Sequence, residues 1–324
     1  MSENKQVNLE PCPLCQGAPR KAFNSRDLLY NLAIDYDYAS CAECACVYQT
    51  PMPSEKTIQS FYPDEYAVYQ PISRKPRIGN WEKAVLQHRY SYQHLQVSFV
   101  YKLFAPLLAM IAYKDSIPFS NSVRLLDIGC GNGKFMNSMT ALGWDCEGVE
   151  FSDTAIQECE KQSLKVFHGD VHAAEFDADT FDVVSIRHVI EHIPDPNIFL
   201  KEISRILKPG GRLVVKTPNS QALGRGYFGV FWFANDVPRH LVLFSPENLA
   251  EAAARQQLAA ITQTCFTTPK IILNSWDYKT NNQGKPSKRK ALPRLLAKAY
   301  VFLANVSGRG DEIFTIFRKT KSSS

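Results

Sequence analysis

The chain has 324 residues, of which 45% are hydrophobic and 21% are charged. This composition excludes a disordered or fibrous protein, and the length suits one large domain with a smaller one. The net charge is only +5, from 37 Lys and Arg against 32 Asp and Glu. A dedicated nucleic-acid binder usually carries a denser basic stripe, so this balance does not favour a nucleic-acid partner.

The first ten residues are polar and lack the apolar segment of a secretory signal, so we expect a cytoplasmic protein. The longest apolar run, 97–113, is interrupted by Lys102 and Pro106. It is shorter than the roughly 20 residues of a membrane span. We therefore expect no transmembrane segment, and we predict that the run forms a helix that is buried or covers a substrate.

Two C-x-x-C pairs stand near the beginning of the chain, Cys12 with Cys15 and Cys41 with Cys44. Each pair can present two thiolates from a tight turn to one tetrahedral ion. A module of this size needs a metal to remain folded. The pattern therefore predicts a zinc-ribbon-like module over 1–50 with these four cysteines as ligands of a structural zinc.

The stretch 28–38 alternates aliphatic and aromatic residues, which favours a hairpin between the two pairs. Cys46 is a fifth thiol that either replaces Cys44 as a ligand or stays free. Unpaired or redox-active cysteines are the alternative to zinc. The other four cysteines are scattered through predicted strands and helices, which is typical of core thiols.

Residues 51–122 are expected to form a linker and a helical cap. The part 51–69 is rich in Pro, Tyr and Phe, and 81–113 has a helical pattern. Aromatic residues in such a helix are more often core contacts than a ligand site, and here they are Tyr90, Tyr92, Phe99, Tyr101 and Phe104.

From 123 to 324 the pattern alternates between strands and helices, which predicts an α/β fold of the Rossmann-like, doubly wound type. Its sheet is expected to be mostly parallel and seven-stranded, with helices on both faces. The expected strands are 123–128, 145–151, 165–168, 181–186, 212–217, 261–267 and 312–317. The expected helices are 134–142, 154–162, 197–207 and 246–260, with a substrate-side insertion at about 268–310.

The first of these strands runs into a glycine turn that contains Gly129, Gly131 and Gly133. Glycines allow the backbone to close on a ligand at the carboxyl end of a sheet. The third glycine comes one residue earlier than in dinucleotide-binding turns, which disfavours NAD or FAD. The Gly-Lys-Ser/Thr sequence of a phosphate-binding loop does not follow.

With this turn and the motifs after it, 123–319 resembles the class I S-adenosylmethionine-dependent methyltransferases. The resemblance implies that S-adenosylmethionine is the cofactor and that Asp127 helps to hold its methionine end. It also implies that Glu150 accepts the ribose hydroxyls, that Asp170 accepts from the adenine amine, and that the Val171 amide donates to the ring. Acidic residues at three successive strand ends are consistent with these roles.

The fourth expected strand leads into His188-x-x-Glu191-His192. This spacing matches an inverted zinc-peptidase motif, but that motif needs a helix, and here it follows a strand and stops at Pro194. The segment is instead similar to ubiquinone O-methyltransferases, in which a Glu-His pair lies beside the substrate and helps to bind a metal. Those relatives have a glutamate at the position of His188, a departure that leaves metal binding here open.

A hydroxyl or carbon acceptor must lose a proton, and a histidine suits that role. The candidates for the catalytic base are His192, His188 and His240, although each could equally be structural. The aromatic, glycine-rich stretch 224–237 is expected either to cover the acceptor as a mobile lid or to pack on the 97–113 helix.

The basic stretch 285–298 could bind an anionic acceptor or touch a membrane surface, or it could be a solvated face. The order of ribbon, aromatic linker and core resembles methyltransferases of surface-polysaccharide and secondary-metabolite pathways, including sugar C-methyltransferases.

We therefore expect an enzyme that methylates an O or C atom of a small molecule, such as a sugar or a lipid or polysaccharide precursor. An RNA or protein methyltransferase recruited through the ribbon, and a non-catalytic cofactor-binding adaptor, are the alternatives. The oligomeric state does not follow from the sequence.

Overall fold

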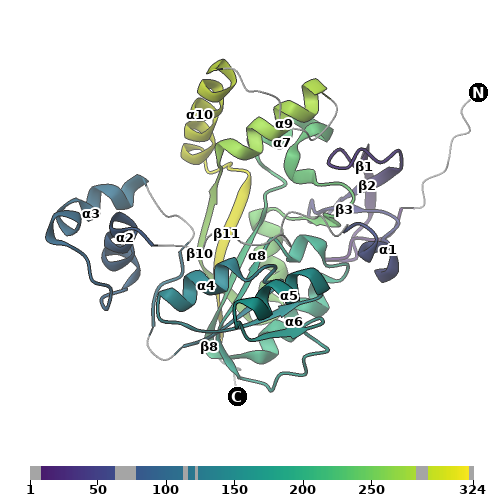
Figure 1. Cartoon of the computed structure of the whole chain (residues 1–324). Coiled ribbons are helices and arrows are strands. Elements are labelled where there is room, and N and C mark those ends of the chain that lie inside the picture. Colours follow the sequence, from purple (N-terminus) through teal and green to yellow (C-terminus); the bar gives the residue numbers. More distant parts are fainter. Residues whose placement is uncertain (1–8, 63–77, 112–115, 121–122, 282–290, 321–324) are drawn as a thin grey trace, which may run out of the picture. The chain divides into compact units, whose positions relative to one another are not determined.

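The computed structural model describes residues 9–62, 78–111, 116–120, 123–281 and 291–320 (Figure 1). The chain divides into two compact units, each made of several stretches. The first unit comprises Met1–Pro63, His188–Lys201 and Val215–Thr315. The second comprises Asp64–Arg187, Glu202–Val214 and Ile316–Ser324. The expected division into a ribbon-like module (1–50), a linker with a helical cap (51–122) and a Rossmann-like domain (123–324) stays a prediction.

The second unit contains a run of parallel strands. The strands are β4 (Arg124–Ile128), β5 (Asp145–Glu150), β6 (Val166–His168) and β7 (Phe181–Arg187). Strand β4 lies between β5 and β7, with Asp127 opposite Gly148 on one side and Ser185 on the other. Helix α4 (Lys134–Ala141) connects β4 to β5 and packs on β5, and α5 (Asp153–Lys161) connects β5 to β6 and packs on β6. Each helix carries the chain back to the end of the sheet at which the next parallel strand begins.

The main sheet has seven strands in the order β10-β11-β8-β7-β4-β5-β6. The three strands not yet named are β8 (Leu207–Pro218), β10 (Leu258–Phe266) and β11 (Glu312–Lys319). The helices between them include α6 (Pro196–Ile206) and α8 (Pro246–Ala254). The expected mostly parallel, Rossmann-like sheet is confirmed. Helix α8 is shorter than expected, because Gln257 adopts a left-handed φ of 62° and the chain then enters β10.

The region expected to be one helix over 81–113 forms two, α2 (Asn80–Tyr90) and α3 (Phe99–Ile111). Helix α2 ends because Ser91 adopts a left-handed φ of 63°. Helix α3 contacts α2 and buries Ala105 and Ala109. The expected burial of the aromatic residues is correct for Tyr90 and Tyr92. It is wrong for Phe99 and Phe104, because they lie on the part of α3 turned away from these alanines. It is also wrong for Tyr101, which is 38% exposed although it stands one helical turn before Ala105.

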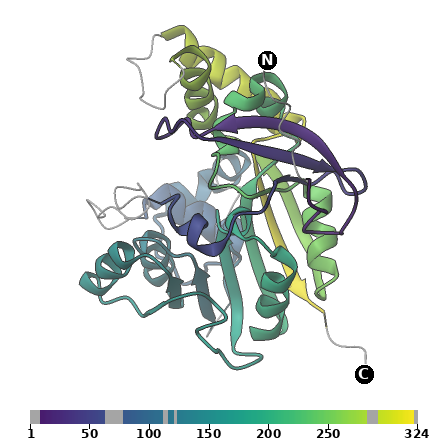
Figure 2. The ribbon, with the colours of Figure 1, turned by 90° about the vertical axis from the view of Figure 1, so that its right-hand side faces the viewer.

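The first unit contains a four-stranded sheet in the order β1-β2-β3-β9. Its strands are β1 (Pro19–Arg26), β2 (Asp35–Cys41), β3 (Val47–Gln49) and β9 (Val242–Leu243). The hairpin of β1 and β2 is longer than the expected 28–38 stretch, much of which forms its connection (Figure 2). Strand β9 comes from far along the chain and pairs antiparallel with β3. The N-terminal module is thus completed by a later strand.

A buried ion cluster holds that module in place. The Arg239 guanidinium is 1% exposed and lies 2.7 Å from an Asp27 carboxylate oxygen and 2.8 Å from one of Asp236. Asp27, also 1% exposed, belongs to the connection between β1 and β2. The Tyr38 hydroxyl, from β2, donates to the His240 carbonyl at 2.9 Å. The hairpin is therefore tied to the segment that carries His240.

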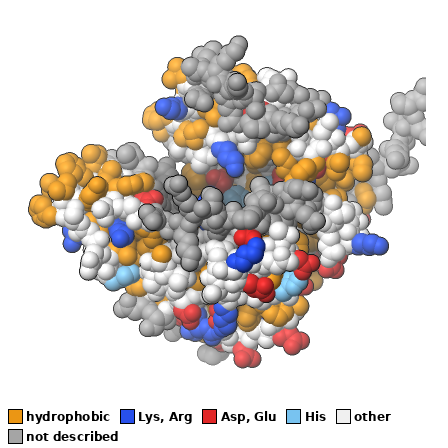
Figure 3. Space-filling model, in the orientation of Figure 1, with side chains coloured by type: hydrophobic (Ala, Val, Ile, Leu, Met, Phe, Trp, Pro, Cys, Tyr) orange, Lys and Arg blue, Asp and Glu red, His pale blue; other side chains and the backbone are white. Residues whose placement is uncertain are grey.

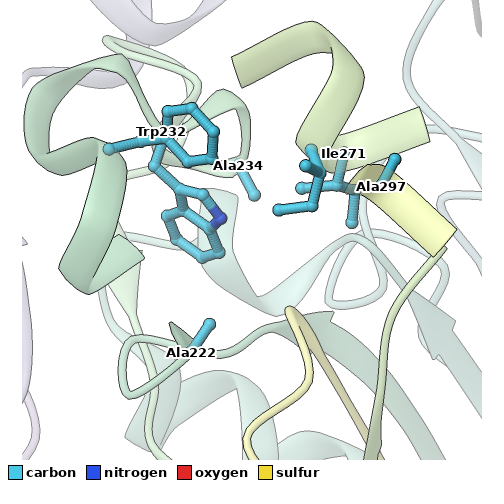
Figure 4. Packing of buried hydrophobic residues seen from close by; sticks show 7 residues of the cluster. Ala222, Trp232, Ala234, Ile271 and Ala297 are labelled. Atoms are coloured by element: carbon cyan, nitrogen blue, oxygen red, sulfur yellow. The ribbon is translucent and has the colours of Figure 1, made fainter. Parts of the chain in front are cut away.

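The expected lid over 224–237 is instead part of a packed core. It forms α7 (Leu223–Phe228) and the short 3-10 helices η2 (Gly229–Phe231) and η3 (Phe233–Asn235). Trp232 is fully buried, and its indole nitrogen donates to Asp311 at 2.7 Å. Around it lie Ile271 from α9 (Pro269–Asn281) and Ala297 from α10 (Ala291–Val306) (Figure 4). The aromatic stretch thus packs against α9 and α10 of its own unit.

Two expected segments extend beyond the described residues. Of the linker at 51–69, the described part contains the short helix α1 (Glu55–Gln59), capped by the Ser54 hydroxyl. Of the basic stretch 285–298, the described part begins with α10. Within the described residues, we find no helix with the length and apolar character to cross a membrane.

Replacing Asp27 by Asn should destabilise the fold, because it leaves the buried Arg239 charge with only Asp236 as an ionic partner. Breaking such a pair costs about 3 kcal/mol in free energy of unfolding. Urea titration monitored by circular dichroism measures the loss, and Asp35→Asn, an exposed position on β2, is the matched control. Equal stability of the two variants would contradict this account.

Candidate functional site

The glycine turn after β4 requires its glycines. Gly129, Gly131 and Gly133 all have left-handed φ values, of 66°, 53° and 76°. A Cβ atom on Gly133 would also lie 2.2 Å from a methyl carbon of Leu164. Side chains at these positions would therefore cost strain and, at Gly133, a clash. The turn therefore places backbone that no side chain covers at the carboxyl end of β4.

Glu150 closes this turn from the neighbouring strand. Its carboxylate is 3% exposed and accepts hydrogen bonds from the amides of Gly131 at 2.8 Å, Phe151 at 2.9 Å and Ser152 at 3.0 Å. Burial raises the pKa of Glu150, although these amides oppose the rise. The carboxylate is thus fixed at the end of β5, in contact with the glycine turn.

Asp127 and Asp170 lie at the ends of the adjoining strands. Asp127 is 3% exposed, and burial raises its pKa to about 7. Asp170 follows β6 and is exposed, with one oxygen accepting from the amides of His172 and Ala173. Val171 beside it is buried. Because β4, β5 and β6 are adjacent and parallel, the three acidic residues share one edge of the sheet.

In the first unit, His188 lies between two carboxylates. Its ring nitrogens lie 3.3 Å from Glu191 and 3.0 Å from Glu312. Burial disfavours the charged ring, but the hydrogen bonds and charges of these carboxylates outweigh it and raise the pKa of His188 to about 9. His188 also has a left-handed φ of 57°, and its amide donates to the Lys216 carbonyl. The two carboxylates therefore favour the protonated form of His188, whose side chain is 44% exposed.

His192 and His240 are held by backbone carbonyls. Nδ1 of His192 lies 2.8 Å from the Arg239 carbonyl, and Nδ1 of His240 lies 2.9 Å from the Ala234 carbonyl. A carbonyl can only accept, so each Nδ1 carries a hydrogen, and the Tyr62 hydroxyl, also 2.8 Å from Nδ1 of His192, then shares that hydrogen as a second acceptor. In the neutral form of such a ring, Nε2 has a free electron pair. Burial and the charge of His240 lower the pKa of His192 to about 4. The rings are neighbours, with centroids 4.8 Å apart.

Glu191 lies beneath both rings and is fully buried. Burial would raise its pKa, but His188 and the other histidines lower it to about 2. One carboxylate oxygen accepts from the Thr217 hydroxyl at 2.8 Å, whereas the other, Oε1, has no hydrogen-bond partner among the described residues. Ligand atoms of Glu191, His192 and His240 lie within 4.8 Å of one another, close enough to share a metal ion.

The four predicted zinc ligands also come together. The thiols of Cys12, Cys15, Cys41 and Cys44 lie within 4.8 Å of one another. Cys12 is 3.7 Å from Cys44, and Cys15 is 3.4 Å from Cys41. Cys46 is buried behind them, with its sulfur 3.8 Å from the carbonyls of Val47 and Leu243. The four thiols are thus close enough together to share one metal ion.

A family model described as a methyltransferase domain matches residues 88–263, more than half of the chain. The chain belongs to this methyltransferase family. Among curated proteins, it is similar to ubiquinone biosynthesis O-methyltransferases. The protein of Mesorhizobium japonicum is 33% identical over 165 residues, which cover 46% of this chain and 65% of that protein. That of Maricaulis maris is 35% identical over 131 residues, covering 38% and 51%.

Solved structures with similar folds are also methyltransferases by name. A SAM-dependent methyltransferase from Archaeoglobus fulgidus has a TM-score of 0.46 and 20% identity, with coverage of 72% of this chain and 99% of that one. A putative methyltransferase in complex with the Haloferax volcanii Trm112 activator has a TM-score of 0.49 and 17% identity, with coverage of 76% and 96%. The chain matches between 40% and 65% of the length of the first four curated relatives.

Several residues of this methyltransferase's histidine cluster were missed in the sequence. Glu312, Thr217 and the Arg239 carbonyl contact the cluster from positions far from His188 and His192 in the chain. Spacing within a motif carries no signal for such partners. The acidic residues at the strand ends could be found because each follows a recognisable strand.

Replacing Glu312 by Gln should lower the pKa of His188 from about 9 toward its ordinary value of 6.5, because one of two ionic partners is lost. The raised pKa means that this cluster stabilises the fold fully below pH 6.5 and loses that contribution as the pH rises through about 9. Histidine ring NMR over this range measures the pKa, and Glu251→Gln on α8 is the exposed control. An unchanged His188 titration in Glu312→Gln would contradict the assignment.

Proposed function

We propose that this protein transfers a methyl group from S-adenosylmethionine to an oxygen atom of a small molecule. The observation that carries the proposal is the glycine turn with Asp127, Glu150 and Asp170 at the carboxyl ends of adjacent parallel strands. The names of the similar curated proteins favour an oxygen acceptor. A sugar, or a lipid or polysaccharide precursor, stays a prediction for the acceptor's identity.

Each acidic residue has a distinct role in this proposal. Asp127, as a carboxylate, attracts the ammonium group of the methionine end. Glu150, fixed by three amides, accepts from the ribose hydroxyls with its remaining electron pairs. Asp170 accepts from the adenine amine with the oxygen that does not cap the following turn, and the Val171 amide donates to the ring. Such positioning supplies much of the catalysis in a methyl transfer.

We propose His192 as the catalytic base. Methyl transfer breaks the bond from the sulfonium sulfur to the methyl carbon and forms a bond from that carbon to the acceptor oxygen. The acceptor's hydroxyl proton must leave, and a neutral Nε2 of His192 can receive it. His240 offers a second neutral nitrogen. His188 is protonated at neutral pH, so its role here is to hold Glu191 as a carboxylate.

The metal implied by the resemblance fits the same cluster. Its ligands would be Glu191, His192 and His240, whose ligand atoms lie within 4.8 Å of one another, and the nearest ion-pair partner of Oε1 of Glu191 is His188, at 3.3 Å. With Nε2 of His192 bound to the ion, His192 would not be the base. A divalent ion bound there would lower the pKa of the acceptor's hydroxyl. In either case, the backbone carbonyls of Arg239 and Ala234 fix the orientation of both rings.

We further propose a structural zinc at Cys12, Cys15, Cys41 and Cys44, with Cys46 as a free thiol. The four clustered thiols and the small size of the module support this proposal. All nine cysteines are unpaired, which supports the expected reducing, cytoplasmic location. A small-molecule partner agrees with the names of the relatives, whereas recruitment of RNA or protein through the ribbon has no specific observation in its favour.

Calorimetric titration with S-adenosylmethionine tests the cofactor site. We expect binding that is weakened at least about tenfold in Asp127→Ala and in Glu150→Ala, because each removes a polar anchor of the cofactor. In the parent protein, affinity should also fall as the pH is lowered from 8 to 6, because Asp127, with a pKa of about 7, becomes neutral. Asp127→Asn should remove this pH dependence.

His192→Gln serves as the matched control, since it should bind the cofactor like the parent protein while slowing methyl transfer to hydroxyl acceptors. Failure of the folded parent protein to bind the cofactor would favour the non-catalytic alternative. Unchanged binding in both Ala variants would show that the cofactor lies elsewhere.

Elemental analysis of the purified protein should give about one zinc per chain. Cys12→Ser or Cys44→Ser should lower the zinc content and the melting temperature, because the ribbon depends on its metal to stay folded. Cys46→Ser should retain the zinc, which would show that Cys46 is a free thiol and not a ligand. Full zinc content in Cys44→Ser together with its loss in Cys46→Ser would exchange the roles of these two residues.

A further inference from the structure

Helix α3 of the second unit exposes an unusually apolar face. Phe99, Leu103 and Leu107 recur every four residues and are 78%, 65% and 62% exposed. Val100 and Phe104 extend the same face at 61% and 53%. Figure 3 shows the orange side chains gathered over this helix. Side chains at this spacing lie side by side, so the apolar face is continuous along α3.

The face is free of charge along its length. Lys102 is the only charged residue of α3, and the buried positions Ala105 and Ala109 lie on the opposite side. Exposed apolar patches of this kind mark an interaction surface. Helix α3 has 13 residues, too few to span a bilayer, so any lipid contact would place it in the plane of the surface.

The charge of the surrounding sequence identifies the partner. Positions 74–115 contain seven Lys or Arg and two Asp or Glu, a net charge of +5. The stretch 285–298 is also basic, with six Lys or Arg and no Asp or Glu, but only 74–115 combines such charge with the apolar face of α3. Lys83, Arg89 and Lys102 belong to the helix pair itself, and Trp81 adds a half-exposed aromatic ring. Apolar and aromatic side chains among basic ones are typical of a helix that lies on an anionic membrane.

We propose that the α2–α3 pair is a docking surface for an anionic lipid bilayer. The apolar face of α3 enters the boundary between headgroups and acyl chains, and the basic residues contact the lipid phosphates. This inference goes beyond the methyl-transfer proposal, because it concerns where the protein works and uses none of the proposed site residues.

Vesicle flotation with the full-length protein tests the proposal. The wild-type protein should float with vesicles of phosphatidylglycerol and phosphatidylcholine, bind pure phosphatidylcholine vesicles at least about tenfold less, and be released by high salt. The variant Phe99→Gln/Leu103→Gln/Leu107→Gln should lose at least about tenfold in binding to the anionic vesicles. All three side chains are exposed, so its melting temperature and cofactor affinity should stay unchanged.

The matched control is Phe302→Gln/Leu303→Gln on α10, where two side chains are 67% and 61% exposed. It should float like the wild-type protein. The proposal is overturned if the wild-type protein does not bind anionic vesicles, if the α3 variant floats like wild type, or if only the α10 variant loses binding. It is also overturned if light scattering shows a dimer that the α3 variant converts to a monomer, because the face would then join two copies.

Discussion

The buried charge of Arg239 is the constraint on which the first unit depends. A guanidinium that is 1% exposed must be paired. One partner, Asp27, belongs to the β1–β2 connection, and the other, Asp236, lies three residues before Arg239 in the chain. The Arg239 carbonyl faces the His192 ring, and the next residue, His240, is the second ring of the cluster. One ion cluster therefore fixes both the N-terminal hairpin and the two histidines.

The protein sets the protonation of its carboxylates by what surrounds each one. Burial raises the pKa values of Asp127 and Glu150, and no described cation lies in hydrogen-bond contact with either. Glu191 is buried as deeply, but histidines surround it and its pKa falls to about 2. A cofactor that carries positive charge would supply the counter-charge that Asp127 and Glu150 lack. The histidine cluster, in contrast, already contains its counter-charge in His188.

The features that the sequence predicted well are local. The β-strands of the main sheet, the glycine turn and the two C-x-x-C pairs each depend on residues within a few positions of one another, and the structure has all of them. The course of α2 and α3 could not be predicted in the same way. A left-handed Ser91 ends the first helix, and an apolar run that usually indicates burial lies exposed on the second.

The candidate site shows the same limit more sharply. His188, His192 and His240 were found as residue types, but their roles depend on partners that no local pattern contains. Glu312 and Glu191 raise the pKa of His188, whereas two backbone carbonyls orient the other rings and burial lowers the pKa of His192. A contact with a backbone carbonyl cannot be predicted from residue types, because every residue has such a carbonyl. The choice of a base among three histidines therefore required the fold.

The N-terminal module is better understood as a support for this site than as an appendage. Strand β9 joins its sheet directly after His240, and Tyr38 from β2 donates to the His240 carbonyl. Cys46 packs against the Leu243 carbonyl of the same strand. A metal that folds the cysteine cluster would thus stabilise the backbone on both sides of His240. This coupling gives a reason for a small cysteine-rich module to be retained far in sequence from the glycine turn.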